Sequence, residues 1–539
     1  MHLLRIASFF ILTVLWYPQG RLQNPGDSWQ VSDEKLRRFF QHLRNNYVDA
    51  VNPQKMAEEA IRGVLRSLDP HSYYMTRQEA QDANDQLQGH FEGIGISYYM
   101  DRDTLYILGT IEDSPADRSG LCPGDRLIKV SDTLVAGVRK TSKDITRLIR
   151  QAPGGQVRLV VIRPEEPAPL HFTVKKDRIP YKAVTAAYLI DNQTGYIRLA
   201  RFSSQAHREL VQALKKLNRE GMNRLILDLR DNSGGYLTAA VEVAGEFLPP
   251  QSLVVYTEGL HSHRKNYEVK QKGHFTEGEI IVLVDQNSAS ASEIVAGAIQ
   301  DLDRGIIVGR RSFGKGLVQN TYYFPDGSAI RLTTARYYTP SGRCIQRPYI
   351  PGRPDDYHAE LRQREKRGEL RYKDSIPRID SLRFYTRNKR PVYGGGGIIP
   401  DVFVPRDSLL DDTLLRALQK NNYLYTFALH WVDKNRRKIN QQYSGFQDFE
   451  KRFTPGPDLV EALQKFYQER GITLNLAEAS PTPISRAYTL LKAQIARVIW
   501  DTEEYLRIQN TVDADVQTAL RCFGPEALSI LKSPDDQSR

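Results

Sequence analysis

Apolar and polar positions change their spacing along the chain, and the changes mark boundaries between regions. Residues 29–90 carry apolar side chains at helical spacing, as at Leu36, Phe40 and Leu43, which predicts an N-terminal helical region. From residue 91 to residue 177, short apolar runs alternate with turn residues instead. This pattern is typical of short strands, so we expect a small, inserted β-rich domain with two helices.

Strands and helices alternate from residue 178 to residue 405. Residues 224–230 and 280–285 are apolar through their centres, as in strands buried on both faces of a sheet. Helices follow both runs, so we expect an α/β domain. Within it, residues 350–393 are charged and poor in apolar side chains, which predicts an inserted loop or lid. Residues 406–539 return to helical spacing and predict a C-terminal helical extension.

The composition excludes several classes of protein. Of the 539 residues, 40% are hydrophobic and 26% are charged, as in soluble globular domains and unlike disordered chains. The one long apolar run of the sequence lies at the N-terminus, so a multi-span membrane protein is excluded. The net charge of +11 is spread along the chain. We therefore interpret it as a solvated surface and expect no nucleic-acid partner.

The N-terminus has the pattern of an export signal. Arg5 precedes an apolar run over residues 6–16, which is too short to cross a bilayer but suits the core of a secretory signal. Residues 1–20 therefore predict export to the periplasm or the cell envelope. No pair of small residues marks a cleavage site near Pro18 and Gly20. An uncleaved anchor, with peripheral or anchored membrane association, and a buried first helix remain alternatives.

Cysteine and histidine give no sign of metal chemistry. The three cysteines, Cys122, Cys344 and Cys522, are far apart and make neither a CxxC pair nor a disulfide framework. One pair could still close in an oxidising compartment. The 11 histidines contain no HExxH motif and no cluster with cysteine at ligand spacing. We therefore predict no metal and no cofactor.

A serine-rich segment, residues 287–293 (NSASASE), lies between the buried run 280–285 and the helix expected after it. Ser290 would stand at the N-terminus of that helix, where free backbone N–H groups and the helix dipole stabilise a developing negative charge. A nucleophilic serine suits this position. A serine that merely caps the helix suits it equally well.

A nucleophilic serine needs a base, and the sequence offers two candidates. His274 is the nearest histidine upstream, but no aspartate–histidine pattern accompanies it, so a Ser-His-Asp hydrolase is the weaker alternative. Lys315 stands between two glycines in GKGLVQ. Burial or a nearby positive charge would keep its amine neutral, and Gln319, four residues on, would share its strand face. A phosphate-binding or surface lysine remains open, although the P-loop pattern is absent.

Two adjacent glycines, Gly234 and Gly235, follow the buried run 224–230. Glycine lets backbone N–H groups face a cleft at low steric cost, so this turn is a candidate donor to an oxyanion. A plain turn explains the same two residues.

Taken together, these motifs resemble those of the C-terminal processing peptidases, also called tail-specific serine proteases. The match covers roughly residues 31–405 and includes LDLRDNSGG, NSASASE, GKGLVQ and GGGGIIPDVFVP in the family's order. The resemblance implies that Ser290 is the nucleophile, Lys315 the general base and Gln319 the residue that supports this lysine. Because none of these positions is altered, an active enzyme is expected.

The resemblance also implies a crotonase-like β/α protease core over residues 178–405. In that core, the backbone N–H groups of Gly234 and Ala291 would form the oxyanion hole. The resemblance assigns no role to residues 406–539, and it leaves a homo-oligomer open.

The same resemblance implies that residues 91–177 form a PDZ domain. Backbone N–H groups of one loop would hold the terminal carboxylate of a substrate, and the tail would pair with the next strand edge. The residues of this loop are Gly93, Ile94, Gly95 and Ile96. The expected function is a serine endopeptidase with a Ser-Lys dyad that cleaves extracytoplasmic proteins at or near unstructured C-termini. A scaffold or chaperone that binds C-termini without cutting them is the alternative.

Overall fold

The computed structural model describes residues 25–163, 166–476, 479–524 and 529–532. The chain divides into two compact units, one ending at Val64 and the other beginning at Leu65. The expected signal or anchor segment, residues 1–20, lies outside the described residues. Within the described ranges, none of the helices combines the length and the apolar character that crossing a membrane requires.

The first unit is helical, as predicted for this region. It contains α1 (Pro25–Asn46) and most of α2 (Pro53–Arg66). Proline suits the first position of α2 because its missing N–H would have no partner inside the helix there. Several apolar side chains of α1 remain exposed, namely Trp29, Val31, Leu36 and Phe39.

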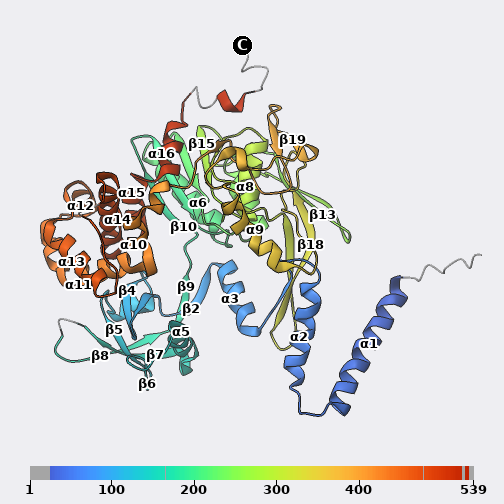
Figure 1. Cartoon of the computed structure of the whole chain (residues 1–539), viewed down its shortest axis with the longest axis horizontal. Helices are drawn as coiled ribbons and strands as arrows, with labels where there is room; N and C mark the ends of the chain where they lie inside the picture. The colour runs from blue at the N-terminus through green and yellow to red at the C-terminus, as the bar shows by residue number, and fades with distance from the viewer. Residues whose placement is uncertain (1–24, 164–165, 477–478, 525–528, 533–539) are drawn as a thin grey trace, which may run out of the picture. The chain divides into compact units, whose positions relative to one another are not determined.

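A six-stranded sheet forms the centre of the second unit (Figure 1). The strand order is β10-β11-β12-β15-β16-β21, and all neighbours are parallel except the antiparallel pair β10 and β11. The strands are β10 (Val184–Leu189), β11 (Thr194–Leu199), β12 (Arg224–Asp228), β15 (Glu279–Val284), β16 (Ile306–Gly309) and β21 (Val402–Phe403). The two apolar runs of the sequence thus form the central strands β12 and β15.

Helices cover both faces of this sheet. One face carries α6 (Ala206–Arg219), α7 (Leu237–Gly245) and α8 (Ala291–Asp301), which share one hydrophobic cluster with the sheet. The other face carries α15 (Thr502–Asn510) and α16 (Ala514–Arg521), whose Leu506 and Val516 are buried in a second cluster with the sheet. The predicted α/β core is confirmed, and part of the C-terminal extension belongs to it.

A second sheet follows the order β1-β18-β13-β14, with β17 paired to β18. Its strands are β1 (Tyr73–Met75), β13 (Leu253–Gly259), β14 (Ser262–Glu268), β17 (Leu317–Tyr323) and β18 (Ala329–Tyr338). Strands β17 and β18 are an antiparallel hairpin that turns at Pro325-Asp326-Gly327. After β1, the chain continues through α3 (Arg77–Gln88).

The β-rich domain is an antiparallel sheet in the order β3-β4-β5-β7-β8, with β6 paired to β5. Its elements are β3 (Ile96–Asp101), β4 (Thr104–Thr110), α4 (Pro115–Ser119), β5 (Arg126–Val130), β6 (Thr133–Leu134), α5 (Ser142–Gln151), β7 (Gln156–Ile162) and β8 (Leu170–Lys175). It has a hydrophobic cluster of its own. The antiparallel pair β2 (His90–Gly93) and β9 (Asp177–Pro180) joins it to the core, so the expected insertion is observed.

The charged stretch 350–393 is folded, and the expectation of a loop is wrong. It contains α9 (Pro354–Lys366), β19 (Arg383–Tyr385) and β20 (Pro391–Tyr393). Arg364 is 2% exposed, pairs with Glu360 at 2.9 Å and donates to the carbonyl of Ser312 at 2.8 Å. Because paired charges and hydrogen bonds replace the lost hydration, this segment packs under the Ser312 loop with few apolar side chains.

The C-terminal extension is helical, as predicted. It begins with α10 (Thr413–Gln419), α11 (Tyr423–Gln442), α12 (Phe446–Arg452), α13 (Pro457–Gln468) and α14 (Pro481–Ile499). These helices form a separate hydrophobic cluster, against which Tyr106 and Leu108 of β4 also pack. The extension therefore contacts the β-rich domain through these helices and the core sheet through α15 and α16.

Candidate active site

Ser290 lies directly before α8, at the carboxyl end of the central strand β15. Its backbone has φ 56° and ψ −112°, whereas a residue that caps a helix is normally extended. A positive φ in a residue other than glycine costs of order 1–3 kcal/mol and is often kept for function. Capping alone does not explain this conformation, which favours the nucleophile interpretation of Ser290.

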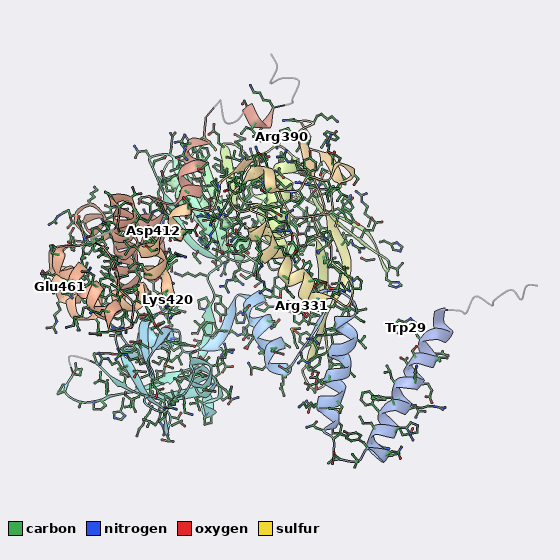
Figure 2. All side chains as sticks on the ribbon, viewed as in Figure 1. Trp29, Arg331, Arg390, Asp412, Lys420 and Glu461 are labelled. Carbon is green, nitrogen blue, oxygen red and sulfur yellow. The ribbon has the colours of Figure 1, made fainter. Side chains whose placement is uncertain are left out.

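Lys315 lies in the same cleft as Ser290, two residues before β17. Burial lowers the pKa of its ammonium from 10.5 to about 8. The positive charge of Arg331, which is labelled in Figure 2 and lies on β18, acts in the same direction. The negative charges of Glu293 and Asp69 oppose these two effects. A substantial fraction of Lys315 is therefore neutral in mildly alkaline solution, as a general base must be.

Glu293 fixes the backbone of Ser290 against the backbone of Lys315. Its fully buried carboxylate accepts hydrogen bonds from the N–H groups of Ser290 at 2.8 Å and Lys315 at 2.9 Å. It also accepts from the N–H of Gly314 at 2.7 Å and the hydroxyl of Ser312 at 2.5 Å. Burial raises the pKa of Glu293, although these hydrogen bonds act against the rise. The sequence motif contains this glutamate, but nothing in the sequence indicated its hydrogen bonds to Gly314 and Lys315.

Tyr337 makes a second link between the same two segments. Its buried hydroxyl lies 3.1 Å from the carbonyl oxygen of Ser290 and 2.5 Å from that of Lys315. A hydroxyl has one proton, so it donates to one carbonyl at a time. This tyrosine on β18 was also missed, because only the paired strands bring it under the cleft.

Gln319 lines the cleft, but it does not share a strand face with Lys315 as expected. Lys315 precedes β17, and the pairing of β17 with β18 shifts register between Val318 and Gln319. Within the described part of the chain, the buried Nε2 of Gln319 has no hydrogen-bond partner. One donor of this side chain is therefore both buried and unpaired in the structure.

Gly234 lies against the nucleophile. A Cβ built on Gly234 would stand 2.9 Å from the Cβ of Ser290 and 3.0 Å from the nitrogen of Ala291. The N–H of Gly234 donates to the side-chain oxygen of Asn232 at 2.9 Å, so this donor is engaged in the structure. The two predicted oxyanion donors, Gly234 and Ala291, are thus brought together next to Ser290.

The cleft has a volume of about 1080 Å³, which is enough for several residues of an extended peptide. It is lined by residues of the core and of the second sheet, among them Gly234, Ser290, Lys315, Gln319 and Tyr337. Residues of α3 also line it, for example Ala83 and Leu87. The structure therefore places the predicted Ser290, Lys315, Gln319 and Gly234 at one open cleft.

None of the histidines in the described ranges lines the cleft beside Ser290, so no Ser-His-Asp arrangement is formed there. His274 binds the carboxylate of Glu246 at 2.7 Å, as does His207, and neither residue lines the cleft. His71 lies near Lys315, and its ring binds the hydroxyl of Tyr357 at 2.8 Å. Burial, helped by the charge of Lys315, lowers the pKa of His71 to about 3, so this imidazole stays neutral.

No three His, Cys, Asp or Glu side chains in the described ranges gather as a metal site. Cys122, Cys344 and Cys522 are all free thiols. The disulfide that the sequence left open is therefore not formed in this structure.

The loop predicted to bind a substrate tail connects β2 to β3. Gly93 ends β2, and the carbonyls of Ile94 and Gly95 accept backbone hydrogen bonds from Ala116 at 2.8 Å and Ile111 at 2.9 Å. These bonds fix the loop through its carbonyl oxygens. Strand β3, which begins at Ile96, is an edge strand that pairs with β4. Its other edge is therefore available in the described sheet for an added strand.

Comparisons with known proteins agree with this architecture. Residues 193–356 match the model of peptidase family S41, and residues 106–163 match that of the PDZ domain. Residues 20–79 match the N-terminal domain of the activating protease CtpB. Residues 414–501, in the C-terminal extension, match a family of unknown function (DUF8443).

Three similar proteins are carboxy-terminal processing proteases. The carboxy-terminal-processing protease of Bartonella bacilliformis is 35% identical over 420 residues, which cover 75% of this chain and 92% of that protein. The carboxy-terminal processing protease CtpB of Bacillus subtilis is 33% identical over 331 residues, 60% of this chain and 68% of its own. The solved photosystem II D1 C-terminal processing protease has 27% identity and a TM-score of 0.34, covering 59% of this chain and 88% of its own.

The α/β core, the cleft and these matches define a serine-type peptidase that carries a PDZ domain. The chain belongs to the carboxy-terminal processing proteases of peptidase family S41.

Proposed function

We propose that the chain cleaves proteins with a Ser290–Lys315 dyad. The neutral amine of Lys315 takes the proton of the Ser290 hydroxyl while the oxygen attacks the scissile carbonyl. The N–H groups of Ala291 and Gly234 stabilise the oxyanion, once Gly234 exchanges its bond to Asn232 for the substrate. Lys315 returns this proton to the leaving nitrogen as the tetrahedral intermediate collapses and releases the amine product. Lys315 then takes a proton from the water that hydrolyses the acyl-enzyme and returns it to the Ser290 oxygen.

The observation that carries this proposal is the electrostatic state of Lys315. The lysine lines the same cleft as Ser290, and burial lowers its pKa to about 8. Glu293 holds the two backbones together without placing its carboxylate oxygens on the amine. A binding module would have no need of a lysine with a lowered pKa beside a serine in a strained conformation.

The pH dependence of cleavage tests the dyad. With an unstructured peptide substrate, we expect kcat/KM to rise with pH and to reach half of its plateau near pH 8, because the neutral amine is the active form. Ser290→Ala provides the blank and should show no cleavage at any pH. A rate that peaks well below neutrality would indicate a carboxylate or imidazole base and would contradict the proposal.

A substitution of Arg331 provides a second test of the pH dependence of cleavage. Its positive charge lowers the pKa of Lys315, so Arg331→Gln should move the midpoint to higher pH. Arg336→Gln is the matched control, because Arg336 is an exposed arginine on the same strand. The control should leave the midpoint where it is.

We further propose that the PDZ domain selects unstructured C-terminal tails. The loop from Gly93 to Ile96 would hold the terminal carboxylate, and the tail would extend the sheet along β3. The free edge of β3 supports this mode of binding. We also propose that the substrates are extracytoplasmic, on the strength of the export pattern in residues 1–20.

Blocking the substrate's terminal carboxylate tests tail selection. We expect a C-terminally amidated peptide to be cleaved with a kcat/KM about tenfold lower than its free acid, because charge-assisted hydrogen bonds are lost. An N-acetylated version of the same peptide is the control and should be cleaved at the unmodified rate. Equal rates for the acid and the amide would rule out recognition of the carboxylate.

A further inference from the structure

The end of the C-terminal extension is built into the protease core. The carboxylate of Glu503 on α15 accepts a hydrogen bond from the N–H of Ala187 on β10 at 2.9 Å. Asn510, at the end of α15, donates to the hydroxyl of Tyr188 at 2.8 Å. With the apolar cluster on the same face of the sheet, these contacts fix where α16 begins.

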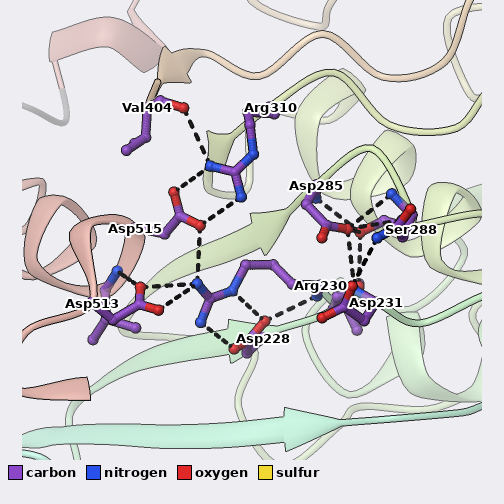
Figure 3. A network of polar contacts seen from close by, with 12 residues as sticks. Asp228, Arg230, Asp231, Asp285, Ser288, Arg310, Val404, Asp513 and Asp515 are labelled. Atoms are coloured by element: carbon purple, nitrogen blue, oxygen red, sulfur yellow. Dashed lines mark hydrogen bonds and ion pairs between the residues drawn. The ribbon is translucent and has the colours of Figure 1, made fainter. Parts of the chain in front are cut away.

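The first turn of α16 places Asp515 between two arginines of the core (Figure 3). One oxygen of Asp515 accepts from both Arg230 and Arg310 at 2.9 Å, and the other accepts from Arg310 at 2.9 Å. Asp515 is 4% exposed and Arg230 is 8% exposed. The carboxylate is therefore a buried link between two cations that would otherwise repel each other.

Further carboxylates hold Arg230 in place. Asp228 accepts from its guanidinium at 2.7 Å and 3.0 Å, and Asp513 accepts from it at 2.9 Å and 3.0 Å. Burial beside these carboxylates keeps Arg230 charged, because their charges raise its pKa against the effect of desolvation. Of these three aspartates in Figure 3, Asp515 is the one that also binds Arg310.

Each of the two arginines lies at the start of a segment that leads to the candidate active site. Arg230 immediately precedes the turn that runs from Asp231 to Gly235 and lies against Ser290. Arg310 follows β16 and begins the segment that leads to Lys315. Strands β12 and β16 flank β15, so Asp515 spans the strand end from which the nucleophile segment starts.

Arg310 also reaches the nucleophile segment itself. Its Nε donates to the side-chain oxygen of Gln286 at 3.3 Å, in the loop between β15 and Ser290. One buried carboxylate of the extension is thus connected to the oxyanion turn, to the lysine segment and, through Arg310, to the serine segment.

We propose that Asp515 is a positioning residue of the active site, which sets the spacing between the oxyanion turn and the Lys315 segment by holding Arg230 and Arg310 together. The proposal rests on the Ser290–Lys315 function proposed above. It gives the end of the C-terminal extension a role in catalysis. Misplacing reacting groups by about 1 Å can cost roughly a hundredfold in rate, so a carboxylate this far from the substrate can still control turnover.

Labelling of Ser290 by a fluorophosphonate probe tests the proposal on the full chain. The Ser290 oxygen displaces fluoride from phosphorus and Lys315 takes the proton, so the labelling rate reports on the dyad and not on tail binding. We expect Asp515→Asn to lower this rate by at least about tenfold. With a peptide substrate, kcat should fall by a similar factor while KM stays within about twofold, because most of the residues that line the cleft lie outside the oxyanion turn and the Lys315 segment.

The matched control is Asp458→Asn, which makes the same substitution at an exposed aspartate in the first turn of α13. It should label at the rate of the unaltered protein. Asp515→Glu keeps the carboxylate and should recover most of the rate lost in Asp515→Asn. If Asp515→Asn melts at a lower temperature but labels at the unaltered rate, Asp515 is merely structural and the proposal is overturned.

A second variant covers the case in which Asp515→Asn does not fold. Arg310→Lys keeps the positive charge but cannot bind both oxygens of Asp515, so it should also label more slowly, by at least about fivefold. A folded Arg310→Lys protein that labels at the unaltered rate overturns the proposal. If the unaltered protein itself carries no label on Ser290, the Ser290–Lys315 function fails together with the proposal. If the unaltered protein is labelled on Ser290 and the variants are labelled at the same rate, the proposal for Asp515 fails but the Ser290–Lys315 function stands.

Discussion

Lys315→Ala is expected to abolish peptide cleavage while the protein stays folded. A general base contributes about 10²–10⁴-fold to the rate, and residues of one catalytic unit act together, so we expect a fall in kcat of at least about 10³-fold. Two nearby groups are poor replacements for the lysine: Glu293 is engaged by backbone donors, and burial lowers the pKa of His71 to about 3, so its imidazole is a weak base. Steady-state cleavage of an unstructured peptide measures the loss.

Folding of this variant is expected to be nearly unaffected. Lys315 carries a positive charge that burial destabilises, so removing it takes away an unfavourable contribution together with some packing. Lys315→Met keeps the packing of the side-chain stem and should be as inactive as Lys315→Ala. Lys270→Ala, at an exposed lysine outside the cleft, is the control for expression and stability. A folded Lys315→Ala protein with normal turnover would show that another group is the base.

The hydrophobic pattern of the sequence was sufficient to predict the fold class, because the central strands are recognisable as continuous apolar runs. The runs that became β12 and β15 are buried on both faces, so their apolar character does not depend on any distant partner. The grouping of the candidate site residues was likewise predictable, because parallel strands bring the loops at their carboxyl ends to one edge of the sheet. Ser290, Lys315 and Gly234 accordingly line one cleft, although their catalytic roles stay predictions.

The supporting residues were not readable, because their partners are far away in sequence. Asp515 binds Arg230 across 285 positions, and nothing in the spacing of the last helices indicates such a contact. Tyr337 reaches Ser290 through strand pairing, which sequence periodicity does not specify. The insertion containing α9 was mistaken for a loop because its buried Arg364 is paired with Glu360 and with the carbonyl of Ser312, not with apolar side chains.

Glu293 shows how a local motif can conceal a structural role. Three residues after Ser290, its position is that of a glutamate in a capping box, and its carboxylate does accept the N–H of Ser290. The same carboxylate also accepts the N–H groups of Gly314 and Lys315. The local interaction was predictable in type, whereas the connection to the lysine segment follows from the parallel pairing of β15 with β16.

Gly234→Ala is expected to cost at least about 10²-fold in kcat, comparable to the loss of an oxyanion donor. Gly234 has φ 103°, and its new Cβ would stand 2.9 Å from the carbonyl oxygen of Ala289 and 3.0 Å from the nitrogen of Ala291. Backbone atoms cannot give way as a flexible side chain does, so the turn must move away from Ser290. The N–H groups of Gly234 and Ala291 would then no longer converge on one oxygen.

Gly221→Ala separates this crowding from backbone strain. Gly221 has a similar φ of 97°, but a Cβ there meets no atom within 4 Å. Both variants should lose of order 1–3 kcal/mol in the free energy of unfolding, because alanine is strained at positive φ. Gly221→Ala should nevertheless cleave peptides normally once folded, since nothing near Ser290 has to move. If folded Gly234→Ala cleaves within about twofold of Gly221→Ala, the turn after β12 does not shape the oxyanion site.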